Sequence, residues 1–331
     1  MRTIGLTYDL KDDYIAAGFS KEEAAEFDSP QTIQALEDTI KSLGFEVDRI
    51  GNLRALMKRL LEGDRWDLVF NIAEGVRGPG RESEVPCLLE AFRIPYTFSD
   101  PMVLALCLHK GMTKHVIRDN RIPTSDFVVL EGEEDVGKVS LTFPLFVKPV
   151  AEGTGKGVSP HSKVETLEAL RKTVHLLWER FHQPVLVERF LPGKEYTVGI
   201  VGTGPEAKVI GGMEIRYGSA AEGNIYSYSN KAHYEGRISY HPIENSTKEK
   251  IYRLALDAYR ALSCRDGGRV DIREDEKGEP QFLEINPLPG LHPVDSDLPI
   301  LSRLNGVSYT QLIEGILSSA CKRNGLSFGV R

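Results

Sequence analysis

Two stretches late in the chain alternate apolar and polar residues, and they predict the element around which the rest is arranged. In residues 268–273, Val270 and Ile272 fall on one face and three charged side chains on the other. Residues 282–290 open with the same alternation, which is typical of half-buried strands. The polar residues 274–281 between them contain Gly278 and Pro280, so the pattern predicts an antiparallel hairpin.

Residues 1–100 alternate short apolar runs with helical periodicity, which is typical of a parallel sheet with helices on its faces. A helix between Ser29 and Gly44 has the clearest signals, because Ser29 suits the N-cap and Pro30 the first helical position. The polar run 21–26 is predicted to be a short helix or a mobile lid. The other predicted elements are strands 3–8, 45–50, 66–72 and 94–98 and helices 53–61 and 84–92.

The pattern in the rest of the chain predicts two α+β units. The protein is therefore expected to have three domains, at residues 1–100, 101–185 and 186–331. The middle unit is predicted to contain a helix over 102–120 that Gly111 interrupts, strands 127–130 and 145–148, and a helix over 164–181. A buried strand near 185–190 is predicted at the boundary between the middle and the last unit. The last unit is predicted to contain strands 196–201 and 208–215, a long polar loop 217–240, and helices 247–262 and 308–322 around the hairpin.

Composition excludes several classes of protein. The 331 residues carry a net charge of −7 and 41% hydrophobic residues, which argues against a surface for nucleic acid or anionic membrane. No apolar run is long enough to span a bilayer, and the N-terminus leads into a strand rather than a signal peptide. The four cysteines lack metal-type spacing, so buried thiols in the cytoplasm are expected.

Three oxygen-bearing side chains are expected to meet on the polar face of the hairpin. Asp271, Glu284 and Asn286 would form an all-oxygen cluster of the kind that suits Mg²⁺, which takes further ligands from water and substrate phosphates. Arg269 lies on the same face and can hold a phosphate or carboxylate beside the metal. An ordinary hairpin with a solvated polar face is the alternative reading of this stretch alone.

A glycine-rich loop follows the strand that ends at Lys148. Residues 152–157 place three glycines within five residues, and such loops offer backbone N–H groups to a phosphate. The spacing is not that of a Walker A loop, and a surface turn is the alternative. Farther on, Phe190 and Leu191 can offer an apolar slot for adenine, and Glu195 can accept from ribose hydroxyls.

Taken together, these stretches resemble the ATP-grasp ligases, and within them the D-alanine–D-alanine ligase family. The resemblance is carried by EGVRGPGRESEVPCLLEAFRIPYTFSDP (74–101), LFVKPVAEGTGKGV (145–158), VLVERFLPGKEYTV (185–198), GRVDIRED (268–275) and FLEINPLPGLHPVDSDLPI (282–300). It implies an ATP-grasp fold of three domains, with an N-terminal Rossmann-like sheet and two α+β domains that clasp ATP. It also implies a homodimer through the N-terminal domain.

The resemblance implies a role for each matching residue. Those for ATP are Lys110 and Lys148 on the phosphates, Glu188 with the backbone of Arg189 and Leu191 at adenine, Glu195 at ribose, and Glu152, Gly153, Gly155 and Gly157 in the flap over the phosphates. Those for the reaction are Lys231 on a lid loop, Thr154 in place of a flap serine, and Arg269 with the Gly290 backbone at the acyl-phosphate intermediate. Asp271, Glu284 and Asn286 would hold two Mg²⁺ ions, for which Mn²⁺ can substitute.

The chain departs from the family's pattern mainly where substrates are expected. Gly155 replaces the second flap serine, Ala232 follows the lid lysine in place of tyrosine, and Ala73-Glu74-Gly75 lacks the family's histidine. The glutamate for the first ammonium group has three candidates, Glu22, Glu23 and Glu26. Aspartates are added in residues 292–297, which would suit a substrate with an extra positive group.

These observations predict a ligase that joins an amino-acid carboxylate to an amine through an acyl phosphate, most simply a D-alanine–D-alanine ligase or a close relative. One alternative is an ATP-grasp ligase or kinase for another amino acid or amine. A nucleotide-binding module without activity is the other. The expected partners are small molecules, without nucleic acid or membrane.

Overall fold

The N-terminal unit is built on a three-stranded parallel sheet. The computed structural model describes residues 2–218 and 236–328. Strands β1 (Thr3–Thr7), β2 (Glu46–Gly51) and β3 (Leu68–Asn71) lie in the order β2-β1-β3 and run parallel. Helices α2 (Pro30–Ser42), α3 (Leu53–Leu61) and α4 (Glu84–Ala91) connect and follow them. The alternation of strand and helix was therefore predicted correctly.

Two segments after strands of this sheet form irregular structure at its carboxyl edge. The first contains the short helix α1 (Lys11–Ala16) and then turns over residues 21–26, where a helix or lid was predicted. The second contains the 3₁₀ turn η1 (Arg81–Ser83). The predicted strand 94–98 is reduced to an isolated bridge between Val69 and Tyr96. Loops at this edge are free to carry side chains for a ligand.

The helix predicted over 102–120 is in fact two helices. Helix α5 (Pro101–Leu108) is followed by His109, whose ψ of 90° is not helical, and α6 (Lys110–Asp119) begins at the next residue. The imidazole of His109 caps α6 by accepting from the backbone N–H of Met112 at 3.2 Å. The break therefore comes before Gly111, and it places Lys110 at the very start of a helix.

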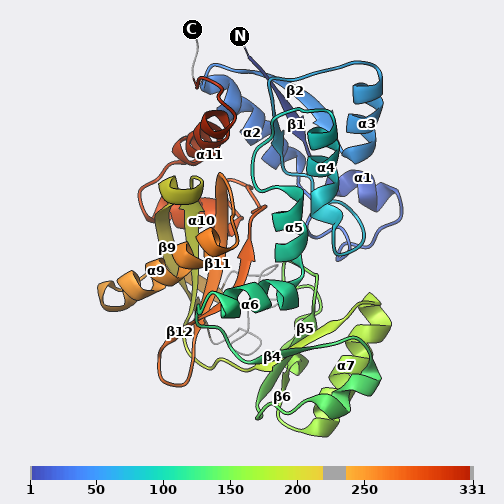
Figure 1. Cartoon of the computed structure of the whole chain (residues 1–331), viewed down its shortest axis with the longest axis vertical. Helices are drawn as coiled ribbons and strands as arrows, with labels where there is room; N and C mark the ends of the chain where they lie inside the picture. Colours follow the sequence, from blue (N-terminus) through green and yellow to red (C-terminus); the bar gives the residue numbers. More distant parts are fainter. Residues whose placement is uncertain (1, 219–235, 329–331) are drawn as a thin grey trace.

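The middle sheet is antiparallel and has the order β4-β7-β5-β6. Its strands are β4 (Phe127–Leu130), β5 (Leu145–Pro149), β6 (Lys163–Val164) and β7 (Val185–Arg189), and helix α7 (Leu167–Phe181) packs on it (Figure 1). The predicted helix start at 164 is wrong, because Val164 pairs in β6 and Thr166 caps α7. The predicted division at 185/186 falls at the start of β7; the domain boundaries stay a prediction.

The third sheet is antiparallel, in the order β10-β9-β8-β11-β12. Its strands are β8 (Glu195–Val201), β9 (Lys208–Tyr217), β10 (Ile238–Pro242), β11 (Gly267–Glu274) and β12 (Pro280–Asn286). The predicted hairpin is confirmed as β11 and β12, with Asp271 opposite Glu284 and Arg269 opposite Asn286. Helices α9 (Asn245–Ala261), α10 (Asp297–Leu304) and α11 (Tyr309–Arg323) accompany this sheet, and of these α10 was not predicted.

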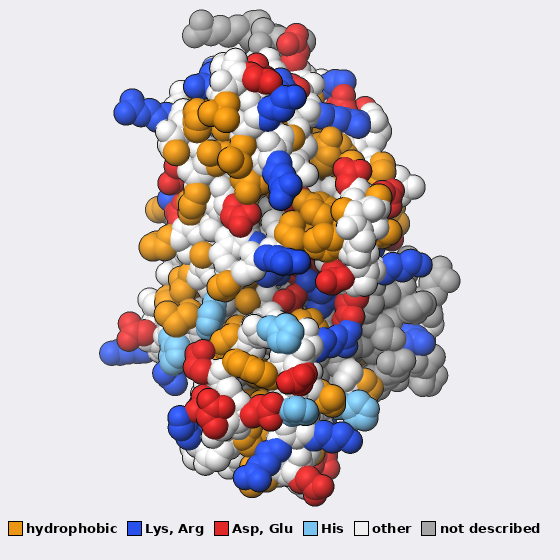
Figure 2. All heavy atoms as spheres, turned by 90° about the vertical axis from the view of Figure 1, so that its right-hand side faces the viewer, with side chains coloured by type: hydrophobic (Ala, Val, Ile, Leu, Met, Phe, Trp, Pro, Cys, Tyr) orange, Lys and Arg blue, Asp and Glu red, His pale blue; other side chains and the backbone are white. Residues whose placement is uncertain are grey.

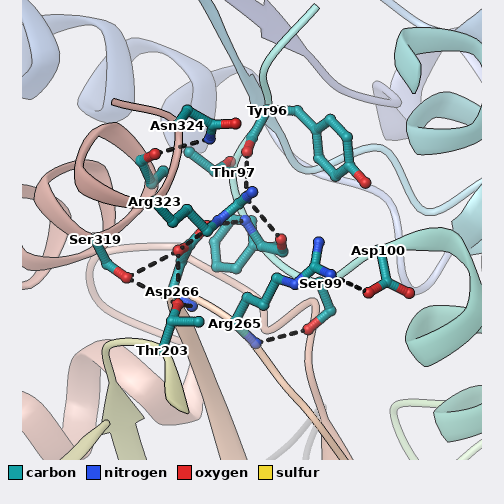
Figure 3. A network of polar contacts seen from close by, with 12 residues as sticks. Tyr96, Thr97, Ser99, Asp100, Thr203, Arg265, Asp266, Ser319, Arg323 and Asn324 are labelled. Atoms are coloured by element: carbon teal, nitrogen blue, oxygen red, sulfur yellow. Dashed lines mark hydrogen bonds and ion pairs between the residues drawn. The ribbon is translucent and has the colours of Figure 1, made fainter. Parts of the chain in front are cut away.

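A buried polar network joins the first and third units just ahead of strand β11 (Figure 3). Asp266 is 0% exposed and accepts hydrogen bonds from Arg323 of α11 at 2.9–3.1 Å. Phe98 N, Ser319 Oγ and Thr203 Oγ1 also donate to it, at 2.8, 2.9 and 3.1 Å. Because Asp266 stands directly before β11, this network positions the strand that carries Arg269 and Asp271.

The main apolar core is continuous between the N-terminal sheet and the C-terminal helices. It includes Ile4 and Phe70 of the first sheet together with Leu298 of α10 and Ile316 of α11. In Figure 1, α11 lies beside α2, near both chain termini. None of the described helices is long and apolar enough to cross a membrane.

Candidate active site

Two buried lysines share one buried glutamate at the centre of the site. Lys148 of β5 and Lys114 of α6 each lie 2.9 Å from an oxygen of Glu188 on β7, and none of the three is more than 5% exposed. Burial alone would raise the pKa of Glu188, but the two ammonium groups outweigh burial and lower that pKa to about 2. Glu188 and Glu284 likewise raise the pKa of Lys148 despite its burial. Both groups therefore stay charged at neutral pH.

A third lysine reaches the same place from the start of α6. The Nζ atom of Lys110 lies 3.7 Å from Glu284 Oε2, which is also 3.8 Å from Lys148 Nζ, and it donates to the carbonyl of Glu152. Burial lowers the pKa of Lys110, and the charge of Glu284 offsets this only in part. Two ammonium groups beside one carboxylate suit an anion such as a phosphate.

These charged groups line a pocket that also has apolar walls, and we name it the lysine pocket. Its apolar lining is Phe146, Val158, Phe190, Leu191 and Leu283, and its charged lining includes Lys110, Lys148, Glu188, Glu195, Asp271 and Glu284. Figure 2 shows that Lys, Arg, Asp and Glu side chains are spread over one face of the molecule, with both signs side by side midway along it. An apolar lining beside cations suits a ligand with a flat ring and phosphate groups.

At one side of the lysine pocket, Glu195 is held by two neighbours on its own sheet. Its Oε2 atom accepts from Arg273 Nη1 at 3.0 Å and from the Tyr217 hydroxyl at 2.6 Å. Burial, followed by the charge of Glu195, raises the pKa of Tyr217, so the phenol remains a donor. Arg189 also lines the pocket, while its guanidinium pairs with Glu276 at 3.0 Å.

The polar face of the hairpin brings the predicted metal ligands together. Arg269 Nη1 lies 2.6 Å from Asp271 Oδ2 and 3.2 Å from Asp297 Oδ2. Asn286 Nδ2 lies 3.4 Å from Asp271 Oδ2, and Glu284 is the cross-strand partner of Asp271. The arginine expected to meet a phosphate or carboxylate therefore also holds two aspartates within the protein.

Glu26, one of the three candidates for an ammonium ligand, ties the glycine-rich loop to the N-terminal unit. Its oxygens accept from Gly153 N at 2.7 Å, from Lys156 Nζ at 2.9 Å and from Arg81 Nη2 at 3.1 Å. Burial would raise the pKa of Glu26, but Arg81 and Lys156 outweigh it and lower that pKa. A Cβ at Gly153 would lie 2.4 Å from the Glu26 carboxylate, so only glycine allows this close approach.

The tip of the loop is strained at Thr154. Thr154 has a φ of +50°, which is unusual for a β-branched residue, and Gly155 and Gly157 follow with φ of +73° and +74°. The hydroxyl oxygen of Thr154 is buried without a hydrogen-bond partner. Strain together with an unsatisfied polar atom is characteristic of sites that bind a ligand.

On the other side of the loop lies a second pocket, which we name the acidic pocket. It shares Lys110, Glu152 and Glu284 with the lysine pocket, so the two are continuous. Its lining carries the carboxyl groups of Glu26, Asp28, Glu74, Glu82, Glu152, Glu284 and Asp295. Thr154, Arg269, Asn286 and Gly290 line it as well. The predicted catalytic residues that the structure describes therefore line the acidic pocket, which joins the lysine pocket at Lys110, Glu152 and Glu284.

Comparison with known proteins identifies the family. Residues 116–318 match the family model described as D-ala D-ala ligase C-terminus. The chain is 31% identical over 318 residues to a D-alanine–D-alanine ligase of Actinobacillus pleuropneumoniae serotype 5b, which covers 93% of this chain and 98% of that protein. The chain belongs to the D-alanine–D-alanine ligase family. It is also 33% identical over 260 residues to an uncharacterised protein, y4sG, of Sinorhizobium fredii, which covers 77% of this chain and 75% of that protein.

The ATP-grasp fold expected from the sequence is confirmed. A crystal structure of D-alanine–D-alanine ligase from Bacillus anthracis complexed with ATP matches the chain with a TM-score of 0.73. The match covers 98% of this chain and 99% of that chain at 22% identity, which demonstrates the shared fold.

The oxygen donors of this D-alanine–D-alanine ligase family member fit Mg²⁺. Asp271 and Glu284 lie in register on adjacent strands, with Asn286 two residues farther along the second strand, and all three present hard oxygen atoms. Elsewhere among the described residues, one group has metal-type side chains within reach of each other: Glu133, His175 and Glu179, all exposed. The hairpin set is the one that adjoins the lysines.

Several predicted residues have other surroundings than expected. Of the ammonium candidates, Glu22 and Glu23 do not line the acidic pocket: Glu22 pairs with Arg180, and the Glu23 carboxylate accepts from the backbone of Ser20 at 2.8 Å. Lys231 and the centre of its predicted lid loop lie outside the described residues.

The sequence analysis missed Lys114, Lys156 and Arg81. Lys114 lies one helical turn after Lys110, and this spacing places both on one face of α6, a usable signal. Lys156 and Arg81 had no such signal, because their shared partner Glu26 is remote in sequence.

Proposed function

We propose that the chain is an ATP- and Mg²⁺-dependent ligase that joins the carboxylate of one amino acid to the amine of a second. The observation that carries the proposal is the junction of the pockets. There, Lys110 and Lys148 lie 3.7 and 3.8 Å from Glu284, between an apolar-lined pocket and the acidic pocket. A nucleotide seated in the first pocket would present its terminal phosphate to a substrate in the second.

In this proposal the lysine pocket holds ATP. The adenine ring would lie against Phe190 and Leu191, near Glu188 and Arg189 at the end of β7, and the ribose would contact Glu195. The phosphates lie against the lysines and under the loop that contains Gly153, Gly155 and Gly157. Because Glu188 holds Lys148, the ammonium group of this lysine is already in place when the phosphates arrive, and Lys114 holds the other side-chain oxygen of Glu188.

The first chemical step would transfer the terminal phosphoryl group. A carboxylate oxygen of the first amino acid attacks phosphorus, the bond to the bridging oxygen breaks, and ADP leaves with that electron pair. Asp271, Glu284 and Asn286 would hold Mg²⁺, which neutralises charge on the phosphoryl oxygens when bound. The lysines stabilise the same developing charge by electrostatics, without covalent participation.

The second step would form the amide. The neutral amine of the second amino acid attacks the acyl carbon, the C–O bond to phosphate breaks, and phosphate leaves with those electrons and takes up the proton that the new amide nitrogen loses. Arg269 and the backbone at Gly290, which line the acidic pocket, would stabilise the negative oxygen at the acyl carbon. The loop that Glu26 ties down would keep out water, which would otherwise hydrolyse the acyl phosphate.

The test measures phosphate release with ATP and Mg²⁺ and pairs of amino acids, with the product mass recorded. An amide together with ADP and phosphate is expected. Lys148→Met should lower kcat/KM by about 10²–10³, as loss of one charge-stabilising group does elsewhere. Lys172→Met, the same change at an exposed residue of α7, should leave it unchanged. ADP without amide would indicate a kinase, and ATP binding without ADP a binding module.

We further propose a cytoplasmic enzyme without nucleic-acid or membrane partners. The four cysteines are free thiols, which suits a reducing compartment. Cys107, Cys264 and Cys321 are buried as expected, whereas Cys87 is exposed. We likewise propose a homodimer through the N-terminal unit and a contact of Lys231 with the terminal phosphates. Light scattering of the purified protein and the turnover of Lys231→Ala test them.

A further inference from the structure

Three carboxyl groups of the acidic pocket have no cationic partner among the described residues. Asp28, Glu74 and Glu82 come from loops at the carboxyl edge of the N-terminal sheet, and all three line the pocket. No ion pair reaches any of them from residues 2–218 or 236–328. In this they differ from Glu26 and Glu152 of the same pocket, which form ion pairs with Arg81 or Lys156.

The cations along the lining are engaged elsewhere. Lys110 contacts Glu284 and the Glu152 carbonyl, and Arg269 contacts Asp271 and Asp297. Beside the lining, Arg81 is held by Glu26 and by the Ala151 carbonyl at 2.9 Å. Lys11 also lines the pocket, and no ion pair within the described chain joins it to the three acids. No cation of the described residues therefore forms an ion pair with these acids, although the charge of Arg81 lowers the pKa of Glu74 and of Glu82, and that of Lys110 lowers the pKa of Glu82.

Burial and neighbouring carboxylates raise the pKa of each of the three acids. Burial is the largest cause of the raised pKa of Glu74, and the charge of Glu82 raises it further. Burial, followed by the charge of Asp9, raises the pKa of Asp28 to about 8. Burial and Glu26 raise the pKa of Glu82 to about 7, although Arg81 opposes them. A cation among them would relieve this repulsion and favour the ionised forms.

A second observation indicates that a ligand belongs here. The buried hydroxyl of Thr154 has no hydrogen-bond partner, and Thr154 lines the same pocket. The pocket is continuous with the lysine pocket through Lys110, Glu152 and Glu284. A ligand spanning the acidic pocket would therefore have a cationic group among the acids and could present its carboxylate at the lysines.

We propose that one of the two joined substrates is a diamino acid, whose side-chain ammonium is bound by Asp28, Glu74 and Glu82. The proposal rests on the ligase function above and adds the class of substrate. A carboxylate at Lys110 and Arg269 and two ammonium groups farther in match the signs of charge along the pocket. A neutral side chain, such as that of alanine, would leave the three acids uncompensated.

The experiment compares ornithine with norvaline, which has the same carbon chain without the second amino group. Each is supplied in D and L form, alone and paired with D-alanine, and phosphate release and product mass are recorded at pH 8. We expect an amide that contains ornithine, and a kcat/KM at least about tenfold above that for norvaline, because a hydrogen bond to a charged group is worth about 1.5–3 kcal/mol. Lysine and 2,4-diaminobutyrate then define the preferred chain length.

Matched variants assign the preference to the pocket. Glu74→Gln and Glu82→Gln should each reduce the ornithine-to-norvaline ratio at least about threefold while ATP affinity, measured separately, stays the same. Glu46→Gln makes the same change at an exposed residue of β2 and should leave the ratio unchanged. If the amide forms equally well from norvaline or D-alanine, or if neither variant changes the ornithine-to-norvaline ratio, the diamino-acid proposal is wrong and the proposed ligase activity still stands. No amide from any pair would overturn the ligase itself.

Discussion

Removal of Arg323 should weaken the joint between the N-terminal and C-terminal parts of the molecule. The guanidinium donates to Asp266 at 2.9–3.1 Å and to the carbonyls of Tyr96 and Phe98 (Figure 3). In Arg323→Ala the carboxylate of Asp266, which is 0% exposed, loses its cation. A buried charge without its partner is one of the few single changes with a large cost.

The size of the effect follows from what remains around Asp266. Loss of one partner of a buried ion pair typically costs about 3–5 kcal/mol. Three neutral donors stay in place, namely Phe98 N, Ser319 and Thr203, so the low end, about 3 kcal/mol, applies. With about 2.1 cal/mol/K of unfolding entropy per residue, 331 residues give about 0.7 kcal/mol/K, so Tm should fall by about 4 °C if the chain unfolds as one unit.

Calorimetry at pH 7 measures this directly. Arg253→Ala, at a salt bridge whose side chains are 73% and 87% exposed, is the matched control and should shift Tm by less than 1 °C. Adding Asp266→Asn to Arg323→Ala should recover part of the loss, because asparagine carries no charge and tolerates the φ of +63° at this position. A loss no larger than that of Arg253→Ala, or a double variant that loses the full sum, would refute the reasoning.

Three other predictions follow from single residues. Lys114→Met should lower the unfolding free energy by about 3–5 kcal/mol in urea denaturation, because it removes a fully buried partner of Glu188; a loss below about 1 kcal/mol would contradict this. Thr154→Gly should hold or raise Tm, since glycine relieves a φ of +50°, yet it should reduce turnover through loss of the hydroxyl; a lower Tm would argue against strain. Burial raises the pKa of Asp28 to about 8 and of Glu82 to about 7, so the folded state keeps protons that the unfolded state releases near pH 4. Stability from this source is complete below about pH 4 and is lost as pH rises through 7–8. Tm should therefore fall between pH 5 and 8.5, and less steeply in Glu82→Gln.

The hairpin could be predicted from sequence because its information is local. Alternation over β11 and β12 determines which side chains share a face, and the polar residues between them determine that the strands run antiparallel. The facing of Asp271 and Glu284 depends in addition on a shift of register between Asp271 and Ile272, which alternation alone does not predict. The information for α2 is likewise local, since Ser29, Pro30 and the apolar stripe act within a few turns, and the structure shows the cap at Thr32 N.

What could not be predicted depends on partners that are remote in sequence. Lys114 looks like a solvated helix residue until β7 places Glu188, 74 positions later, beside it. Burial of a lysine needs a partner, and periodicity alone does not identify one. Helix α10 was missed for a related reason: residues 292–297 were compared with a substrate-binding segment, and the helix begins at the last of them, Asp297.

The distribution of charge at the site separates what ATP would bring from what the amino acids would bring. Around the lysine pocket the protein already pairs its charges: Lys148 contacts Glu188, and Arg269 contacts Asp271. A bound complex of phosphates and Mg²⁺ would offer negative charge to the cations and positive charge to the carboxylates. Around Asp28, Glu74 and Glu82 no such internal pairing exists among the described residues, and burial makes their ionisation costly. A ligand with net positive charge at that end lowers the cost. The phosphate chemistry of the family can therefore be kept while the amino acid it activates, or the amine that attacks, differs from D-alanine.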